Sequence, residues 1–199
     1  MERPLILFAP GAGLPSTSPW MERWADRLGA VGIVERFDYD YVRHGRRRPD
    51  PLAKLIARHR QALDLALERH GRRPVVLVGK SMGSRIGCHL SLEAEVGALV
   101  CFGYPLVGQS GARRDEVLRS LRTPILFVQG TRDAMCPLAE LDALRGEMSA
   151  RSALHVVQTG DHSLEVTKTH SRATGRTQAA EDEAALEAVR AFLGPVTAG

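Results

Sequence analysis

Apolar residues in this chain gather into short runs that are separated by longer amphipathic stretches. Most of the short runs are apolar at consecutive positions, which is typical of strands buried on both faces of a sheet. Six runs are predicted to be strands: residues 5–9, 33–39, 74–78, 96–102, 124–129 and 154–158. The stretches between and after them predict helices over about 20–28, 51–70, 82–92, 115–121, 138–149 and 178–193.

This alternation of strands and helices predicts an α/β fold. The expected architecture is a doubly wound, mostly parallel sheet of about six strands with helices on both faces. The length of 199 residues suits a single domain, residues 1–199, with a core of its own. Ser18 and Asp50 are placed to cap two helices, and Gly71 is placed to end one. The sequence does not decide whether residues 165–178 pack as a helix or form a mobile flap over the site.

The sequence Gly79-Lys-Ser-Met-Gly83 lies between a predicted buried strand and a predicted helix. A serine at the apex of such a turn is the arrangement of a nucleophile elbow, in which the hydroxyl projects above the sheet. Gly79 and Gly83 leave room for the turn, because a Cβ at either position would crowd a neighbouring element. The alternative is a tight strand–helix turn that carries a serine by chance. The strand and helix around it favour the elbow, with Ser81 as nucleophile.

In a doubly wound sheet, ligands bind beyond the carboxyl ends of the strands. Ser81 follows the third predicted strand, Asp133 the fifth and His162 the sixth. This order of serine, acid and histidine is that of hydrolase triads. His162 would accept the serine proton, and Asp133 would orient the imidazole. Asp133 also fits a plain turn former, and Asp161 and His170 are the rivals for the acid and the base.

Two backbone N–H groups are expected to form an oxyanion hole. One belongs to Met82, at the start of the helix after Ser81, and the other to Gly11 or Ala12, in the loop after the first strand. Lys80 is expected to point away from the site, to pair with a nearby carboxylate and to take no part in catalysis. Chemistry of this kind needs no metal and no organic cofactor.

Composition and charge exclude few classes of binding partner. The formal net charge is +4, but the arginines are spread along the chain, so the charge does not indicate nucleic-acid binding. The basic loop of residues 43–48 fits capture of an anionic substrate or acidic partner, or the commoner solvated surface loop. The apolar run near the N-terminus is too short for a signal peptide or a membrane span, so no membrane partner is expected.

The cysteines indicate a compartment. Cys88, Cys101 and Cys136 form no pair with disulfide or metal spacing, which fits free thiols in a reducing cytoplasm. Cys136 lies three residues after Asp133, and a buried or incidental role suits it better than that of a reactive thiol. We therefore expect a cytoplasmic protein.

Three blocks of the chain carry a more specific resemblance. They are Gly-Lys-Ser-Met-Gly-Ser-Arg at 79–85, Phe-Val-Gln-Gly-Thr-Arg-Asp at 127–133 and Gly-Asp-His-Ser at 160–163. They resemble a small α/β-hydrolase family of compact bacterial hydrolase-like proteins, a testis-expressed human relative and the hydrolase-like domain of subunit 3 of the NSL acetyltransferase complex. Dienelactone hydrolases, which carry a cysteine in place of Ser81, are similar more distantly.

This resemblance implies the α/β-hydrolase fold, with Ser81, Asp133 and His162 as triad and residues 10–13 as oxyanion loop. It also implies a minimal core with little or no lid, because no long insertion separates Tyr104 from Pro124.

We therefore predict a serine hydrolase of carboxylesterase or thioesterase type. It would cleave an ester or thioester of a small soluble acyl substrate through an acyl-enzyme, as a monomer or homodimer. An alternative of another class is a hydrolase-fold module whose site is vestigial and whose surface binds a protein partner. A peptidase or amidase is a third possibility. The distance from the His162 ring to Ser81 distinguishes the enzyme from the module.

Overall fold

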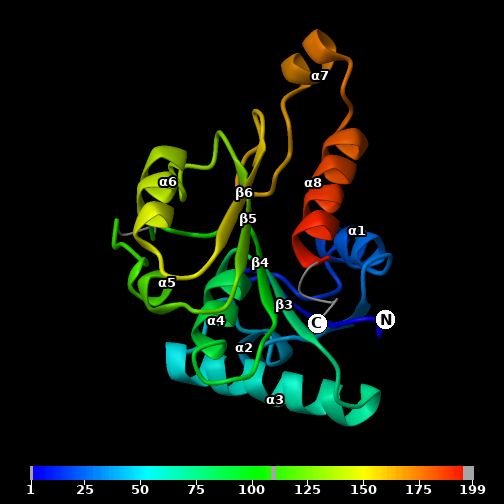
Figure 1. Cartoon of the computed structure of the whole chain (residues 1–199), viewed down its shortest axis with the longest axis vertical. Coiled ribbons are helices and arrows are strands. Elements are labelled where there is room, and N and C mark those ends of the chain that lie inside the picture. Colours follow the sequence, from blue (N-terminus) through cyan, green and yellow to red (C-terminus); the bar gives the residue numbers. More distant parts are fainter. Residues whose placement is uncertain (1, 109–110, 195–199) are drawn as a thin grey trace.

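The computed structural model describes residues 2–108 and 111–194, and its six strands form one parallel sheet (Figure 1). The spatial order is β2-β1-β3-β4-β5-β6. The predicted α/β class and the doubly wound parallel sheet are thereby confirmed. The strands are β1 (Leu5–Ala9), β2 (Ile33–Arg36), β3 (Val75–Lys80), β4 (Ala98–Phe102), β5 (Ile125–Gly130) and β6 (Ser152–Val157). The helices are α1 (Pro19–Leu28), α2 (Asp40–Arg43), α3 (Leu52–His70), α4 (Met82–Leu90), α5 (Glu116–Ser120), α6 (Leu138–Glu147), α7 (Lys168–Thr174) and α8 (Gln178–Leu193).

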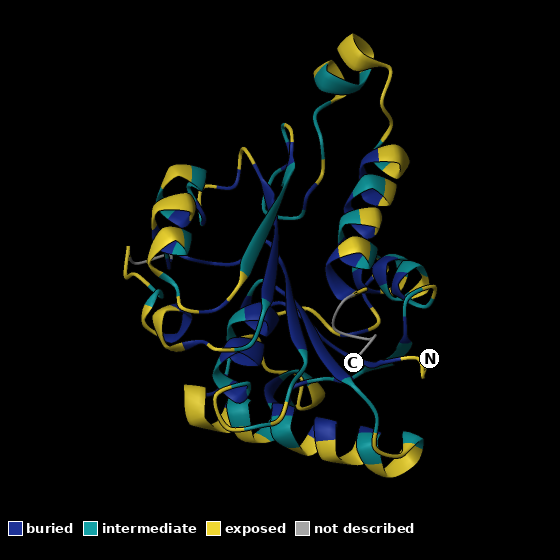
Figure 2. Cartoon of the chain, in the orientation of Figure 1, coloured by how far each residue is buried: buried dark blue, intermediate teal, exposed yellow. Residues whose placement is uncertain are grey.

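Helices cover both faces of the sheet. In β1, Leu5 and Leu7 belong to the apolar core shared with α3, α4, α5 and α6, whereas Ile6 and Phe8 belong to the core shared with α1 and α8. Figure 1 shows these two layers, and Figure 2 shows the strands as the buried centre between them. Because apolar side chains are buried on both faces, the strands carry apolar residues at consecutive positions.

The second strand is shorter than predicted. It ends at Arg36 and not at residue 39. Beyond it, the carboxylate of Asp38 accepts a hydrogen bond from the Ser16 N–H at 2.6 Å, so the chain is tied to the loop after β1. The short helix α2 then begins at Asp40, which the sequence pattern did not predict. Tyr39 and Tyr41 of this segment are fully buried, which explains the apolar pattern that suggested a longer strand.

One of the two predicted helix N-caps is confirmed and the other is wrong. Ser18 holds the N-cap position of α1 with Pro19 as the first helical residue, as predicted, although its hydroxyl makes no capping hydrogen bond. Pro51, and not Asp50, holds the N-cap position of α3. Asp50 instead accepts hydrogen bonds from both terminal nitrogens of Arg46, at 2.9 and 3.2 Å, which is a paired, charge-assisted contact. Gly71 ends α3 as predicted, with φ 75°.

Half of the unassigned segment 165–178 forms the short helix α7. Its N-cap Thr167 accepts a hydrogen bond from the His170 N–H, and none of the helix residues is buried. Figure 1 shows α7 projecting beyond the end of α8. Two side chains tie it there, because His170 and Arg176 both contact Glu181 of α8.

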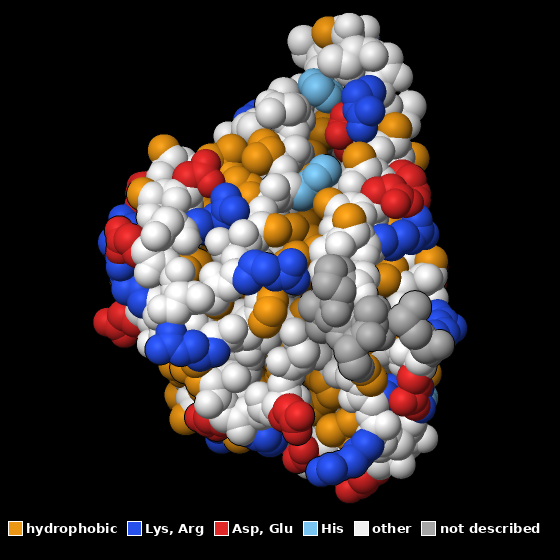
Figure 3. Space-filling model, viewed as in Figure 1, with side chains coloured by type: hydrophobic (Ala, Val, Ile, Leu, Met, Phe, Trp, Pro, Cys, Tyr) orange, Lys and Arg blue, Asp and Glu red, His pale blue; other side chains and the backbone are white. Residues whose placement is uncertain are grey.

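The surface carries charges of both signs. On the face drawn in Figure 3, Lys and Arg side chains alternate with Asp and Glu, and the described residues show no extended basic patch there. Within residues 2–108 and 111–194, no helix is long and apolar enough to cross a membrane.

Candidate active site

Ser81 lies at the tip of a strained turn between β3 and α4. Its backbone has φ 50° and ψ −113°, a conformation that residues other than glycine rarely adopt. The flanking glycines are required by contact: a Cβ on Gly79 would lie 2.2 Å from the Ser84 nitrogen, and one on Gly83 would lie 2.4 Å from the Ala9 oxygen. The turn therefore has the geometry of a nucleophile elbow, with α4 packed directly against the end of β1.

The three candidate residues meet at the carboxyl ends of β3, β5 and β6. The Oγ of Ser81 lies 2.8 Å from His162 Nε2, and His162 Nδ1 lies 2.7 Å from Asp133 Oδ2. An ionised carboxylate can only accept hydrogen bonds, so Nδ1 carries the ring proton and Nε2 is free to accept the serine proton. The Asp133 side chain is fully buried, whereas that of His162 is 29% exposed. A substrate carbonyl could therefore reach Ser81 from solvent.

Asp133 accepts hydrogen bonds from three groups. Besides His162, the Met135 N–H donates to Oδ1 at 2.9 Å, and the Gln129 side chain donates to Oδ2 at 2.5 Å. Burial acts to raise the pKa of this carboxyl, but the contacts with His162, Met135 and Gln129 outweigh burial and leave the pKa below its usual range. The carboxylate is therefore ionised at neutral pH, as an orienting partner of a histidine needs to be.

Gln129 is a site residue that the sequence analysis missed. It is fully buried at the end of β5, and its Oε1 accepts the Tyr104 N–H at 3.0 Å while its Nε2 contacts Asp133. The amide thus links the loop after β4 to the acid. A polar residue at the end of an otherwise apolar run was the available signal.

Two of the predicted oxyanion donors, Met82 and Gly11, lie beside Ser81. Met82 is the first residue of α4, and in the described structure its N–H and those of Gly11 and Ala12 donate to no other group. Gly11 is close to the nucleophile, because a Cβ built on it would lie 3.6 Å from Ser81 Cβ. Ala12 is exposed in the same loop. The next N–H, that of Gly13, is already bound by the Tyr41 hydroxyl at 2.9 Å.

Lys80 does not point away from the site, contrary to the prediction. Its side chain is buried, and Nζ donates a hydrogen bond to the backbone carbonyl of His162. Its expected carboxylate partner is missing, since the ion pairs of the described residues include none with Lys80. Sequence alone could not show this contact, because 82 positions separate the two residues.

The rival residues are engaged elsewhere. Asp161 accepts the N–H groups of Ser163 and Glu165, at 2.7 and 3.1 Å, which is the role of a turn former. His170 contacts Glu181 at 3.3 Å. Cys136 is buried, and burial is the main cause that raises its pKa to about 12, so the thiol is not activated.

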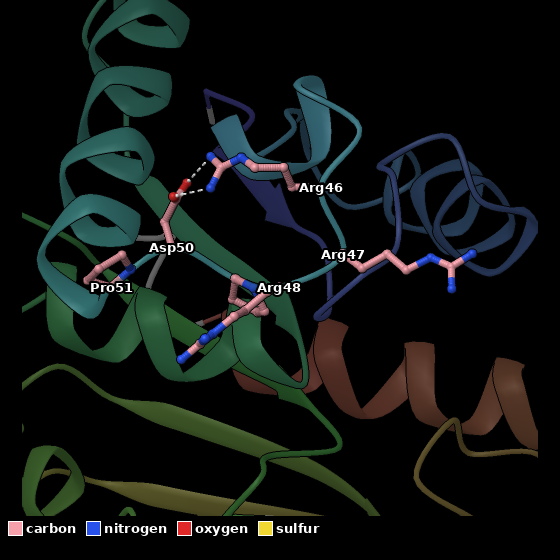
Figure 4. A pocket seen from close by; sticks show the side chains of 6 residues that line it. Arg46, Arg47, Arg48, Asp50 and Pro51 are labelled. Atoms are coloured by element: carbon pink, nitrogen blue, oxygen red, sulfur yellow. Dashed lines mark hydrogen bonds and ion pairs between the residues drawn. The ribbon is translucent and has the colours of Figure 1, made fainter.

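The basic loop lies next to an open hollow of about 610 Å³, lined by residues 46–51. Figure 4 shows Arg46 directed at Asp50, whereas Arg47 and Arg48 point away from that pair. Neither Arg47 nor Arg48 forms an ion pair within the described residues. Ser81, His162 and Asp133 do not line this hollow.

A metal centre has no support in the described part of the chain, where no cluster of three or more His, Cys, Asp or Glu side chains could hold an ion. The three cysteines are free and buried.

Comparison with known proteins gives one family match. The family model of an alpha/beta hydrolase domain matches residues 2–194.

Solved structures share the fold at low sequence identity. Est1E from Butyrivibrio proteoclasticus, with ferulic acid bound, has a TM-score of 0.75 at 15% identity, over 100% of this chain and 91% of that one. A dienelactone hydrolase from Anabaena variabilis has a TM-score of 0.71 at 19% identity, over 96% and 86% of the two chains. An alpha-beta serine hydrolase homologue from Coxiella burnetii has a TM-score of 0.69 at 18% identity, over 81% and 78%.

Proposed function

Because this chain belongs to an alpha/beta hydrolase domain family, we propose that it is a serine hydrolase that cleaves an ester or thioester of a small soluble acyl substrate. The observation that carries the proposal is the continuous hydrogen-bonded chain from Ser81 through His162 to Asp133, with distances of 2.8 and 2.7 Å. A vestigial site has no need of this alignment. The dienelactone hydrolase from Anabaena variabilis and the serine hydrolase homologue from Coxiella burnetii, which share the fold, add support for hydrolysis. A cytoplasmic location remains part of the proposal.

The reaction would have two halves. Ser81 Oγ attacks the substrate carbonyl while its proton moves to His162 Nε2, and the negative charge on the carbonyl oxygen is stabilised by the N–H groups of Met82 and of Gly11 or Ala12. His162 then gives its proton to the leaving alcohol or thiol, and an acyl-enzyme remains. A water molecule, deprotonated by the same nitrogen, attacks the acyl-enzyme and releases the acid and free Ser81. Asp133 stabilises the imidazolium in both halves without taking the proton.

Labelling with a fluorophosphonate probe tests whether the serine is activated. We expect the purified protein to be labelled, and the Ser81→Ala and His162→Ala variants not to be labelled. Ser91→Ala is the matched control, because Ser91 lies at the other end of α4 and donates to the Cys88 carbonyl. This control variant should label like the unchanged protein. A screen of short-chain esters, thioesters and amides then separates the three hydrolase types.

The alternative is an interaction module with a vestigial site. If the folded protein is not labelled by the probe, the hydrolase proposal is wrong. The search would then move to a protein partner.

A further inference from the structure

Lys80 is a buried cation to which the proposed chemistry assigns no step. The residue is only 4% exposed, although lysine is among the residues least often buried without a partner. Its Nζ donates to the carbonyl oxygen of His162 and lies 5.4 Å from the centroid of the Trp20 ring. A buried ammonium group is therefore held by one carbonyl and one aromatic face, directly beside the nucleophile in the chain.

The space around this contact is kept clear by a glycine. Gly103 follows β4 with φ 62°, and a Cβ on it would lie 2.6 Å from the His162 oxygen and 3.1 Å from Lys80 Nζ. A side chain at this position would displace the contact. The absence of a side chain at Gly103, after β4, therefore leaves room for Lys80 Nζ to contact the backbone carbonyl of His162.

Several hydrogen bonds attach the loop that carries His162 to neighbouring elements. The Trp20 indole N–H donates to the Ser163 carbonyl at 2.9 Å, and the Arg132 N–H donates to the Gly160 carbonyl at 2.9 Å. Lys80 makes a further attachment, and this one acts on the backbone of His162 itself. It starts from the last residue of β3, directly before Ser81, so it links the backbones of the candidate base and nucleophile.

We propose that Lys80 is a positioning residue that fixes the backbone of His162 relative to Ser81, and that it does so while its ammonium group is charged. This inference rests on the proposed hydrolase function. The carbonyl contact keeps Nε2 within reach of Ser81 Oγ in both halves of the reaction. A displacement of about 1 Å at such a contact can cost on the order of 100-fold in rate.

The charge of Lys80 depends on pH within the working range. Burial lowers the pKa of Lys80 to about 8, against the opposing effect of Asp133 and Asp161. The groups that face the ammonium are Asp133 after β5, Asp161 and His162 after β6, and Trp20 of α1. Above pH 8 the amine becomes neutral, donates more weakly to the carbonyl and loses its attraction to the indole ring. Activity should therefore fall through about pH 8.

Unfolding would not cause this fall. The pKa of Lys80 is 10.5 in its usual state and about 8 in the folded protein, so between these values the unfolded chain binds the proton that the folded chain has lost. This group therefore makes folding more favourable as the pH rises from 8 to 10.5. If activity falls while the free energy of unfolding rises between pH 8 and 10.5, the fall in activity comes from the lost charge of Lys80 and not from unfolding.

The test compares Lys80→Met, which has neither donor nor charge, with Lys80→Gln, which keeps a neutral donor. Kinetics with p-nitrophenyl butyrate between about pH 6 and pH 9.5 should show kcat of Lys80→Met lowered 10- to 100-fold, on the order expected for a misplaced base, with KM within about threefold. Lys80→Gln should recover part of kcat. Both variants should lack the descending limb near pH 8 that the unchanged protein shows. Lys168→Gln, on the exposed face of α7, is the control and should match the unchanged protein.

Hydrogen exchange tests the contact between Lys80 and His162 without relying on catalytic activity. At one fixed pH, the peptide containing residues 160–164 should exchange faster in Lys80→Met than in Lys168→Gln, whether or not the protein is catalytic. An active protein in which Lys80→Met keeps both kcat and the descending limb would overturn the positioning role alone. A protein with unlabelled Ser81 but faster exchange in Lys80→Met would overturn the hydrolase proposal and leave the loop contact standing. If Lys80→Met does not fold, Lys80→Gln decides by its pH profile.

Discussion

At the scale of single residues, the buried carboxylate of Asp133 sets the direction of the whole hydrogen-bond chain. Three donors converge on it, from His162, Gln129 and the Met135 backbone. An acceptor surrounded by donors cannot be replaced by a group that itself donates without one repulsive contact. The sequence predicted the acid by its place after a strand. It did not predict the contacts of Gln129 with Tyr104 or of Lys80 with His162, because each joins segments that are distant in the sequence.

Asp133→Asn is expected to lower kcat by about 10³- to 10⁴-fold, as removal of the acid does in other triads. The amide NH₂ would face one of the three donors, and the proton would move to the wrong nitrogen of His162. Steady-state kinetics measures this loss. Asp64→Asn, on the exposed face of α3, is the matched control and should keep full activity. Unchanged kcat in Asp133→Asn would show that the acid does not orient the base.

At the scale of elements, the strands were easier to predict than the segments between them. A strand buried on both faces leaves a continuous apolar run in the sequence, and β1, β3, β4 and β5 all show it. The pattern failed at β2, α2 and α7. The errors at β2 and α2 have one cause, because Tyr39 and Tyr41 are buried beyond the end of β2 without being in a strand. In α7 no residue is buried, so no apolar periodicity exists to detect.

Helix α4 offers a matched pair of glycines. A Cβ on Gly83 would lie 2.4 Å from the Ala9 oxygen, which is backbone and cannot move aside, whereas the nearest atom to a Cβ on Gly87 is 3.6 Å away. Gly83→Ala should destabilise the fold by about 1–3 kcal/mol, as overpacking does elsewhere, and should lower activity because α4 carries Ser81. Gly87→Ala should raise stability by up to about 1 kcal/mol through helix propensity.

Urea unfolding measures both glycine changes. The expected result is a lower midpoint for Gly83→Ala and an equal or higher midpoint for Gly87→Ala. Equal losses in the two variants would argue against a direct contact between α4 and the end of β1.

At the scale of the whole molecule, the parallel direction of the strands explains why residues far apart in the sequence could be predicted to lie close together. Carboxyl ends of parallel strands lie on one edge, so residues after β3, β5 and β6 are brought to the same region. The sequence therefore predicted the fold and the meeting of Ser81, Asp133 and His162. It could not predict how surface arginines are distributed around that edge, because their pairing depends on side-chain directions.

Four arginines have no carboxylate partner within the described residues: Arg47, Arg48, Arg85 and Arg114. Arg85 lies one turn after Ser81, and burial, followed by the charge of Arg114, lowers its pKa. Arg85 and Arg114 line a small hollow with Leu52 and with one carboxylate, that of Glu116. Leu52 follows the loop that contains Arg47 and Arg48. Unpaired positive charge of this kind favours an anionic group on the substrate.

We therefore expect a larger kcat/KM for the p-nitrophenyl monoester of glutarate than for the neutral pentanoate ester of similar length. Added salt should reduce the ratio of the two values, because exposed charges are screened. Replacing Arg47 and Arg48 together by Gln should lower the ratio about 2- to 30-fold, since exposed ion pairs contribute about 0.2–1 kcal/mol each. Arg172→Gln, on α7, is the control for net charge and should leave the ratio unchanged. A ratio near one that is insensitive to salt would mean that these arginines form only a solvated surface loop.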